Sequence, residues 1–400
     1  MENNVAHVES LTIQQEEGLG KLPEIAESLY QQAQQSSNQH GLLNGRMGMF
    51  WFLYAYNEYI SEESRYALVA EEMLMETINV LYRQPNFHYR DAAELGTMIL
   101  YLQQRDYLDS SFDEVLEKID GLLSQAIDPM LKQGNFDTFS GYLPIARYFL
   151  KRPNRQGKKI LDTVLKNLAC IREISDHKSF YRSRLFDSNQ VYLGWGHGLA
   201  GILLLLGQLK DSEALPTSSE AIIDALLQGI TAYLLAHRQN SPTRLYPDIA
   251  GEPGIEMPMN LCYGDAGVAY SIWQSGMALN DTALASKGMR DLLLIANRRQ
   301  PKLIGINDAS LMYGSTGISL LFKQVHEHTG NVLFNDAATF WYNTSLAFSR
   351  QSNATAGFAR KTRNAQPLVD CCLSEGLAGY GLSIMTYHGC DIELLPTIGY

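Results

Sequence analysis

The sequence predicts an all-α protein, an α/α toroid (barrel) of seven helical hairpins that forms a single domain over residues 1–400. Three observations predict it. A short motif, Gly-x-x-Gly, recurs along the chain. A strongly apolar run follows the motif, and a more polar, amphipathic segment separates one copy from the next. Such recurrence indicates a repeat architecture, in which each unit buries its apolar face against its neighbours.

The motif recurs between about residue 42 and residue 385. The spacing between successive copies ranges from 48 residues, as between Gly45 and Ala93, to 66 residues, between Gly198 and Gly264. This spacing suits one helical hairpin per copy. The seven pairs of equivalent positions are Gly45 and Gly48, Ala93 and Gly96, Gly141 and Pro144, Gly198 and Gly201, Gly264 and Gly267, Gly314 and Gly317, and Gly376 and Gly379. We predict inner helices that follow Gly48, Gly96, Gly141, Gly201, Gly267, Gly317 and Gly379.

Each glycine of the motif has an expected role. The first lies where a loop turns into a helix, and a positive φ is open to it. The second lies in the first helical turn, where a missing side chain lets a neighbouring helix approach. The run after it, such as Ile202 to Leu206, is apolar on nearly every side, so the helix must be buried all round.

The segments between copies predict outer helices with one solvated face. Examples are Ser64 to Tyr82, Phe112 to Ala126 and Ser218 to Ala236. An open solenoid needs polar caps at its ends, but the seventh copy is largely apolar, which favours closure into a ring. Helix N-termini and glycine loops then gather at one mouth, where we expect the functional residues.

Two polar segments interrupt the period, at residues 151–190 and 334–368. We predict long surface loops for both. The alternative is that they are mobile elements at the mouth that clamp a peptide.

Composition excludes several classes of protein. A formal net charge of -11 argues against nucleic acid as a partner, because phosphates require clustered Lys and Arg. The polar, acidic N-terminal stretch predicts no signal peptide, and the most apolar stretch, Leu199 to Leu209, is too short to span a membrane. Five cysteines without a Cys-x-x-Cys pair predict reduced thiols and a cytoplasmic location.

The ordered set GHGLAG, CYGDAG and LSEGLAG within seven glycine motifs resembles the lanthionine synthetase C (LanC-like cyclase) family. The resemblance covers nearly the whole chain. It implies a seven-hairpin toroid that adds cysteine thiols of a peptide to dehydroalanine or dehydrobutyrine, which closes thioether (lanthionine) rings. The implied partners are that dehydrated precursor peptide and a dehydratase.

The resemblance also implies one zinc ion, held by a Cys in a WCYG-type motif and by a Cys-His pair in the next repeat. Cys262, before Tyr263, matches the first ligand, but Met312 and Tyr313 occupy the place of the pair. A thioether, and a phenol with a pKa of about 10, are poor ligands for zinc. We therefore expect no metal cofactor, with Cys262, Tyr263, Met312 and Tyr313 as residues of the pocket.

His197 and Asp137 match the family residues that are associated with proton transfer. A histidine at a positive helix end is expected to stay neutral and able to exchange a proton near neutral pH. On spacing alone, Asp137 is equally a helix N-cap.

Three functions remain open. The first is a zinc-independent cyclase with His197 and Asp137 as catalytic residues. The second is a non-catalytic family member that binds a modified peptide or a dehydratase. The third is a glycosidase, which needs two carboxylates across the mouth. The carboxylates available for it are those of Asp137, Asp248, Glu252 and Asp265.

Overall fold

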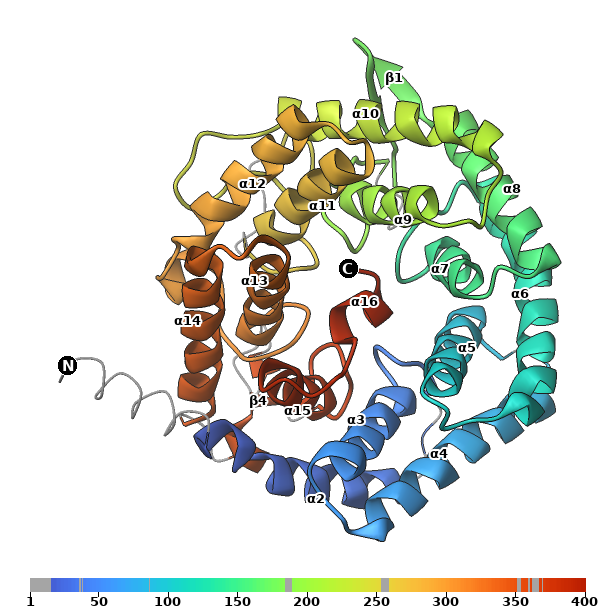
Figure 1. Cartoon of the computed structure of the whole chain (residues 1–400), viewed down its shortest axis with the longest axis vertical. Coiled ribbons are helices and arrows are strands. Elements are labelled where there is room, and N and C mark those ends of the chain that lie inside the picture. The colour runs from blue at the N-terminus through green and yellow to red at the C-terminus, as the bar shows by residue number, and fades with distance from the viewer. Residues whose placement is uncertain are drawn as a thin grey trace. The chain divides into compact units, whose positions relative to one another are not determined.

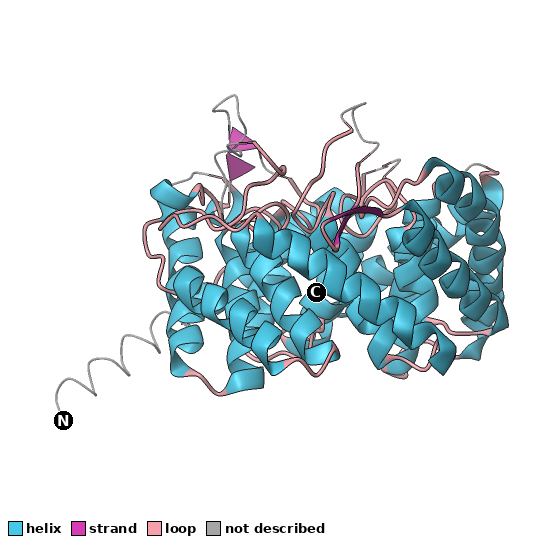
Figure 2. Ribbon diagram, turned by 90° about the horizontal axis from the view of Figure 1, so that it is seen from above, coloured by secondary structure: helices cyan, strands magenta, loops and turns pink. Residues whose placement is uncertain are grey.

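The computed structural model describes residues 16–400 except 36, 38, 86, 184–188, 253–258, 351–353, 359, 362–366 and 369. The chain divides into two compact units. Unit 1 comprises Met1–Gln84 and Ile306–Ile398, and unit 2 comprises Pro85–Gly305 with Gly399–Tyr400. Helices make up most of each unit, and the short strands lie in the segments that join helices (Figure 2).

Unit 1 contains the first, sixth and seventh copies of the motif. Its helices are α2 (Leu22–Ala33), α3 (Arg46–Tyr59), α4 (Ser64–Arg83), α13 (Ser315–Thr329), α14 (Val332–Ser349), α15 (Leu377–Tyr387) and α16 (Leu394–Ile398), with η5 (Thr355–Gly357) and the strands β3 (Arg360–Lys361) and β4 (Pro367–Leu368). The inner helices α3 and α13 pack on the outer helices α4 and α14. Helix α15 packs against α2, α3 and α13, so α2 is its outer neighbour (Figure 1).

Unit 2 contains the second to fifth copies. Its elements are α5 (Tyr89–Gln104), η1 (Ser110–Phe112), α6 (Asp113–Gln133), α7 (Leu143–Lys151), α8 (Arg155–Ile171), β1 (Glu173–Ser175), β2 (Lys178–Phe180), α9 (Leu199–Asp211), η3 (Thr217–Ser219), α10 (Glu220–Ala236), α11 (Asp265–Ala278), α12 (Thr282–Ala296) and η4 (Pro301–Ile304). Inner helices α5, α7, α9 and α11 pack on outer helices α6, α8, α10 and α12, respectively (Figure 1).

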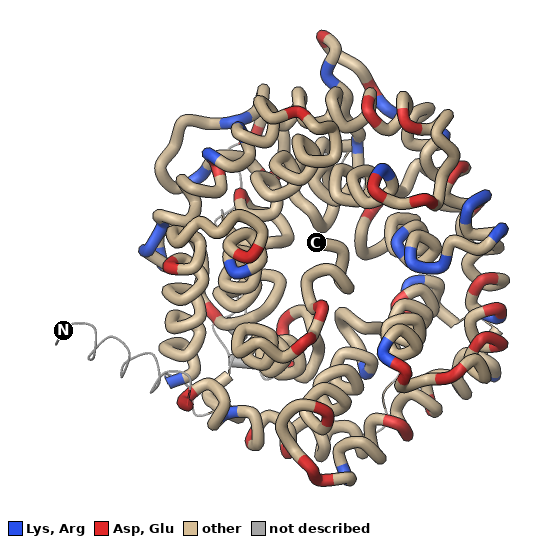
Figure 3. The backbone as a smooth tube through the Cα atoms, in the orientation of Figure 1, with Lys and Arg blue, Asp and Glu red and all other residues tan. Residues whose placement is uncertain are grey.

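The division into inner and outer helices follows the distribution of charge. In Figure 3 many acidic and basic residues of unit 2 lie along outer helices such as α6, and some lie on the inner helices α5 and α7, whereas α9 is uncharged until its last two residues. Residues Leu199 to Gly207 of α9 are all buried, as the apolar run predicts. The outer helices predicted at residues 64–82, 112–126 and 218–236 are confirmed as α4, α6 and α10.

The prediction of a long loop over residues 151–190 is wrong. Helix α8 and the antiparallel pair β1–β2 occupy most of this segment. Helix α8 is polar overall but buries one stripe, which includes Ile160, Leu161, Val164, Leu165 and Leu168. The segment 334–368 is also helical for its first half, as α14, and part of its remainder lies outside the described residues.

One stretch of the described residues, Thr217–Ala236, is long and apolar enough by composition alone to cross a membrane. It comprises η3 and α10, and its packing explains its composition. Helix α10 contacts α9 on one side and strand β2 on another, where the rings of Phe180 and Tyr233 stack with centroids 4.8 Å apart. A helix covered on two sides needs apolar residues on both.

The positive φ considered for the first glycine is wrong, whereas the second lies in the first helical turn as expected, for example Gly48 in α3 and Gly201 in α9. The inner helices α3, α9, α11, α13 and α15 begin directly after the first glycine, which has an extended backbone: φ is −144° at Gly198 and −94° at Gly264. The reason for glycine is close packing, because a Cβ at Gly198 would lie 2.1 Å from the Tyr192 carbonyl oxygen. The second glycine is also crowded by its own loop, since a Cβ at Gly201 would lie 2.4 Å from the Trp195 carbonyl oxygen.

The second and third copies do not follow this pattern, since α7 begins two residues after Gly141 and the second copy departs further. Helix α5 begins at Tyr89, so Gly96 lies in the middle of the helix instead of following a loop. A Cβ there would lie 2.4 Å from the Tyr148 ring of α7, which shows that Gly96 is needed for contact between neighbouring inner helices.

We predict opposite effects for two glycine substitutions near α9. Gly198→Ala should lower the free energy of unfolding by about 1–3 kcal/mol, because the added methyl group meets a backbone oxygen that cannot move away freely. Gly207→Ala, where a Cβ would meet only Ala278 at 4.0 Å, should be neutral or stabilise the helix by up to about 1 kcal/mol. Thermal unfolding of both variants measures the difference, and equal midpoints would contradict the packing argument.

Candidate functional site

The loops of the third, fourth and fifth motifs are joined by backbone hydrogen bonds within unit 2. The Thr138 amide donates to the Gly196 carbonyl at 3.1 Å, and the Gly196 amide donates to the Cys262 carbonyl at 3.0 Å. The Thr138 hydroxyl adds a bond of 3.0 Å to the Trp195 carbonyl. These bonds hold Asp137, His197 and Tyr263, each adjacent to one of the joined residues, close together.

Asp137 caps a turn of its own loop. Its Oδ1 accepts hydrogen bonds from the Phe139 amide at 2.8 Å, the Ser140 amide at 2.7 Å and the Ser140 hydroxyl at 3.0 Å. Helix α7 begins at Leu143, so Asp137 is not the N-cap of that helix. The side chain is 3% exposed, and the turn leaves Oδ2 available for one further partner.

That partner is His197. Its Nδ1 lies 2.5 Å from Asp137 Oδ2, and its Nε2 lies 2.9 Å from the Tyr263 hydroxyl. A carboxylate accepts, so the proton is assigned to Nδ1, and in the neutral ring Nε2 is then the acceptor that Tyr263 donates to. The three side chains form one hydrogen-bonded chain, which we call the Asp137–His197–Tyr263 relay.

Aromatic rings surround the imidazole. The ring centroids of Phe139, Tyr192 and Tyr263 lie 5.3, 6.0 and 5.4 Å from that of His197. The His197 side chain is 14% exposed. The imidazole therefore keeps limited access to solvent while its orientation is fixed, an arrangement suited to proton exchange with a bound molecule.

The orientation of Tyr263 was not predicted from the sequence. Asn260 Oδ1 accepts a hydrogen bond of 2.7 Å from the Tyr263 amide, just as Asp137 Oδ1 accepts from Ser140. Both acceptors lie four residues before the first glycine of their motifs. This recurring Asp or Asn is a signal that the sequence carried, because such side chains cap turns.

The sequence matches the family model described as "Lanthionine synthetase C-like protein" over residues 36–398. The protein belongs to the lanthionine synthetase C-like family. A search of curated proteins found no match.

Among solved structures, this LanC-like protein is similar to one described as "Nisin cyclase". The TM-score is 0.73 at 13% sequence identity, and the alignment covers 94% of this chain and 96% of that chain. At this identity the similarity shows the fold. It confirms the predicted fold class, an α/α toroid of seven helical hairpins.

The zinc that the family implies needs thiolate, imidazole or carboxylate ligands. In unit 2, Cys262 is fully buried, with its sulfur packed so closely on Gly196 that a Cβ there would lie 2.5 Å from it. Both ring nitrogens of His197 are engaged in the relay. Across the described part of the chain, no three His, Cys, Asp or Glu side chains come together as a metal site. Cys262 and His197, as they lie among the described residues, do not fit a zinc ion.

Met312 and Tyr313, at the positions of the family's Cys-His pair, belong to unit 1. Met312 is 1% exposed, and its amide donates to the Ser374 carbonyl at 3.0 Å. This bond repeats in unit 1 the contact between neighbouring loops that Gly196 and Cys262 make in unit 2. Tyr313 is partly exposed.

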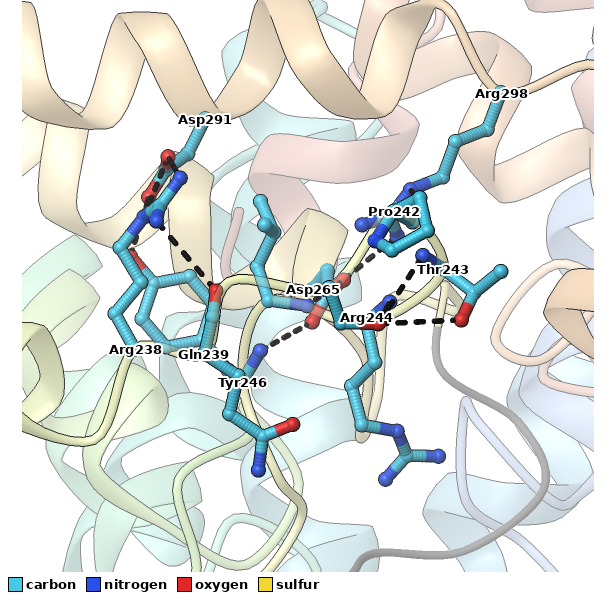
Figure 4. Close-up of polar contacts among 11 residues, drawn as sticks. Arg238, Gln239, Pro242, Thr243, Arg244, Tyr246, Asp265, Asp291 and Arg298 are labelled. Atoms are coloured by element: carbon cyan, nitrogen blue, oxygen red, sulfur yellow. Dashed lines mark hydrogen bonds and ion pairs between the residues drawn. The ribbon is translucent and has the colours of Figure 1, made fainter.

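Asp265, a carboxylate considered for a glycosidase, holds a loop in place. Its Oδ2 accepts from the Leu245 amide at 2.7 Å and from Arg298 Nη1 at 2.6 Å, and its Oδ1 accepts from the Tyr246 amide at 2.8 Å (Figure 4). The side chain is fully buried. The neighbouring Asp291 similarly accepts from Arg238 and from the Tyr246 hydroxyl.

The other two candidate carboxylates also have partners. Asp248 is buried and lies 3.5 Å from Arg244, and the exposed Glu252 accepts a hydrogen bond of 2.6 Å from Gln190. Of the four, Asp137 and Asp265 each accept at least three hydrogen bonds. These carboxylates are organised to hold loops, and nothing in their contacts indicates a sugar substrate.

We predict that Asp265→Asn lowers the free energy of unfolding by about 3–5 kcal/mol, because it leaves Arg298 buried without a counter-charge. The exposed Glu117→Gln on α6 is a control that should change it by less than about 0.5 kcal/mol. Denaturant unfolding provides the measurement. A stable Asp265→Asn protein would contradict the structural role and reopen a catalytic one.

Proposed function

We propose that this protein is a lanthionine-forming cyclase that works without zinc. Its substrate is a precursor peptide that carries dehydroalanine or dehydrobutyrine, which a partner dehydratase supplies. The observation that carries the proposal is the relay, with Asp137 Oδ2 at 2.5 Å from Nδ1 and the Tyr263 hydroxyl at 2.9 Å from Nε2 of His197. Membership of the LanC-like family supports the type of reaction.

The relay supplies what the addition needs. A peptide thiol gives its proton to His197 Nε2, directly or through the Tyr263 hydroxyl, as its sulfur bonds to the β-carbon of the dehydroamino acid. The electron pair of the carbon–carbon double bond moves toward the adjacent carbonyl as an enolate. The same proton then returns to the α-carbon, so no atom is gained or lost. Asp137 stabilises the imidazolium between the two steps.

A free thiol with a pKa of about 8.5 is only slightly ionised at neutral pH, so it needs a base or a metal. Zinc would lower that pKa where its ligands exist. Here Met312 and Tyr313 occupy the positions of two of the family's three zinc ligands. The buried Cys262 alone cannot hold the ion. The base in the relay and the proximity of the two reacting groups then remain as sources of rate.

A second candidate is a family member that binds a modified peptide or a dehydratase without catalysis. One observation favours it: the Tyr263 hydroxyl already occupies His197 Nε2, the position from which a base would act. In this case the relay is a structural element of the peptide-binding surface.

We predict that His197→Ala and Asp137→Asn each slow cyclisation of a dehydrated peptide by about 10²- to 10⁴-fold, the usual contribution of a general acid or base. Cys262→Ala should cost only packing, about 1–2 kcal/mol of stability, and leave the rate nearly unchanged. Mass spectrometry with thiol alkylation measures free and cyclised peptide over time. A reaction without enzyme is required as a control, because dehydrated peptides also cyclise unaided.

The pattern across the variants separates the candidates. Loss of activity in Cys262→Ala with no effect of His197→Ala would reject the metal-free mechanism. If the wild-type protein never exceeds the reaction without enzyme, the binding function replaces the cyclase.

We predict that protein purified without added metal contains much less than one zinc per chain. Elemental analysis together with protein quantitation measures it, and Cys262→Ala should give the same value as the wild type. A stoichiometric zinc that Cys262→Ala removes would contradict the argument from the ligands.

A further inference from the structure

Gly399 and Tyr400 are built into unit 2. Tyr400 is 5% exposed. Its hydroxyl donates to the Leu261 carbonyl, its ring stacks on Trp195 with centroids 5.2 Å apart and an interplanar angle of 27°, and the Tyr270 ring centroid lies 6.1 Å away. A phenol with both its ring and its hydroxyl satisfied is held in one orientation.

The backbone before Tyr400 is equally well fixed. Gly399 has φ +103°, a conformation that glycine adopts readily, and a Cβ there would lie 2.7 Å from Arg147 Nε. The Arg147 guanidinium lies over the Trp195 ring, 5.2 Å from its centroid. Arg147 and Trp195 therefore form a layered contact that Gly399 and Tyr400 complete.

Trp195 and Leu261, which Tyr400 contacts, occupy equivalent positions in their loops. Trp195 lies two residues before His197, and Leu261 lies two residues before Tyr263. The Leu261 carbonyl is confined further by Gly267, where a Cβ would lie 2.4 Å from it and 2.8 Å from the Tyr400 hydroxyl. The Tyr400 side chain thus contacts both loops. Two residues further along each loop lie His197 and Tyr263, which are hydrogen-bonded to each other.

Burial raises the pKa of Tyr400 well above its ordinary value, and the nearby Cys262 thiol contributes in the same direction. The phenol is therefore protonated near neutral pH and can donate its hydrogen bond to the Leu261 carbonyl.

We propose that Tyr400 is a positioning residue, which fixes the Leu261–Tyr263 turn against the Trp195–His197 turn and so keeps the Tyr263 hydroxyl on His197. Its effect on catalysis rests on the proposed cyclase function, whereas its effect on the loop does not. The contacts of Tyr400 are with the Leu261 carbonyl and the Trp195 ring, so it acts through these two residues.

The test compares Tyr400→Phe with Tyr181→Phe in the full chain. The first substitution keeps the ring stack and removes the hydrogen bond to Leu261. The second removes an equivalent bond, since the buried Tyr181 hydroxyl donates to the Leu168 carbonyl at 3.0 Å, and it keeps the ring that contacts Phe136 beside Asp137. Loss of general stability should therefore be similar in both variants.

Two readouts report on the loop without any activity. Hydrogen–deuterium exchange of the peptide that covers residues 259–264 includes the Tyr263 amide, and alkylation of the buried Cys262 reports its opening. We expect both to rise about 2- to 10-fold in Tyr400→Phe, the range for one lost hydrogen bond, and to stay at the wild-type level in Tyr181→Phe. Equal rates in the two variants would overturn the proposal.

Kinetics on a dehydrated peptide supply the third readout. We expect kcat to fall by about 2- to 10-fold in Tyr400→Phe with KM unchanged, because the base is misaligned while the peptide still binds. An unchanged kcat would overturn the positioning role. If the loop loosens as expected but the wild-type protein has no activity above the control, the positioning of the loop stands and the cyclase function is rejected.

Discussion

The functional site depends on how closely each glycine loop packs over the start of its inner helix. At Gly198 and Gly201 there is no room for a Cβ, because carbonyl oxygens of the same loop lie 2.1 and 2.4 Å from where it would be. In a loop folded back this tightly, the residue two positions before the first glycine lies against the neighbouring loop. Gly196 and Cys262 bond to each other in this way, and His197 and Tyr263 follow them in the chain. The relay is therefore a consequence of how the repeats are packed.

The same loop geometry also explains why an acid lies beside the histidine. Asp137 and Asn260 occupy equivalent places, and each uses one oxygen to cap its turn. An amide has one oxygen, which capping occupies, whereas a carboxylate has a second oxygen for a neighbouring loop. Asp137 directs that oxygen to His197 Nδ1. A residue that first serves to fold the loop thus also orients the His197 ring.

The sequence predicted the elements that a local residue pattern encodes. It missed the features that depend on contacts between residues far apart in the chain. The apolar run after Gly201 predicted a buried helix, whereas the polar α8 concealed its narrow apolar stripe. Gly96 was expected in the first turn of its helix, but it lies in the middle of α5, where contact with Tyr148 explains it. His197 and Asp137 were identified through a family resemblance, and their hydrogen bond, like the contact of Tyr400 with Leu261, joins residues far apart in the chain. No pattern of spacing reveals such pairs.

The hydrogen bond from Tyr263 to His197 can be weighed against catalysis by its size. Removing one such bond costs about 0.5–1.5 kcal/mol, which corresponds to a change in rate of roughly ten-fold at most. The tyrosine can therefore slow a base at Nε2 but does not abolish its activity. General-base catalysis contributes about 10²- to 10⁴-fold, and holding two reactants in contact contributes up to about 7–11 kcal/mol. Under the proposed function, a chain that lacks the family's Cys-His pair but keeps its loops would retain both the general base and the proximity of the reactants. The closed relay of the free protein is thus compatible with a working base once a thiol competes for Nε2.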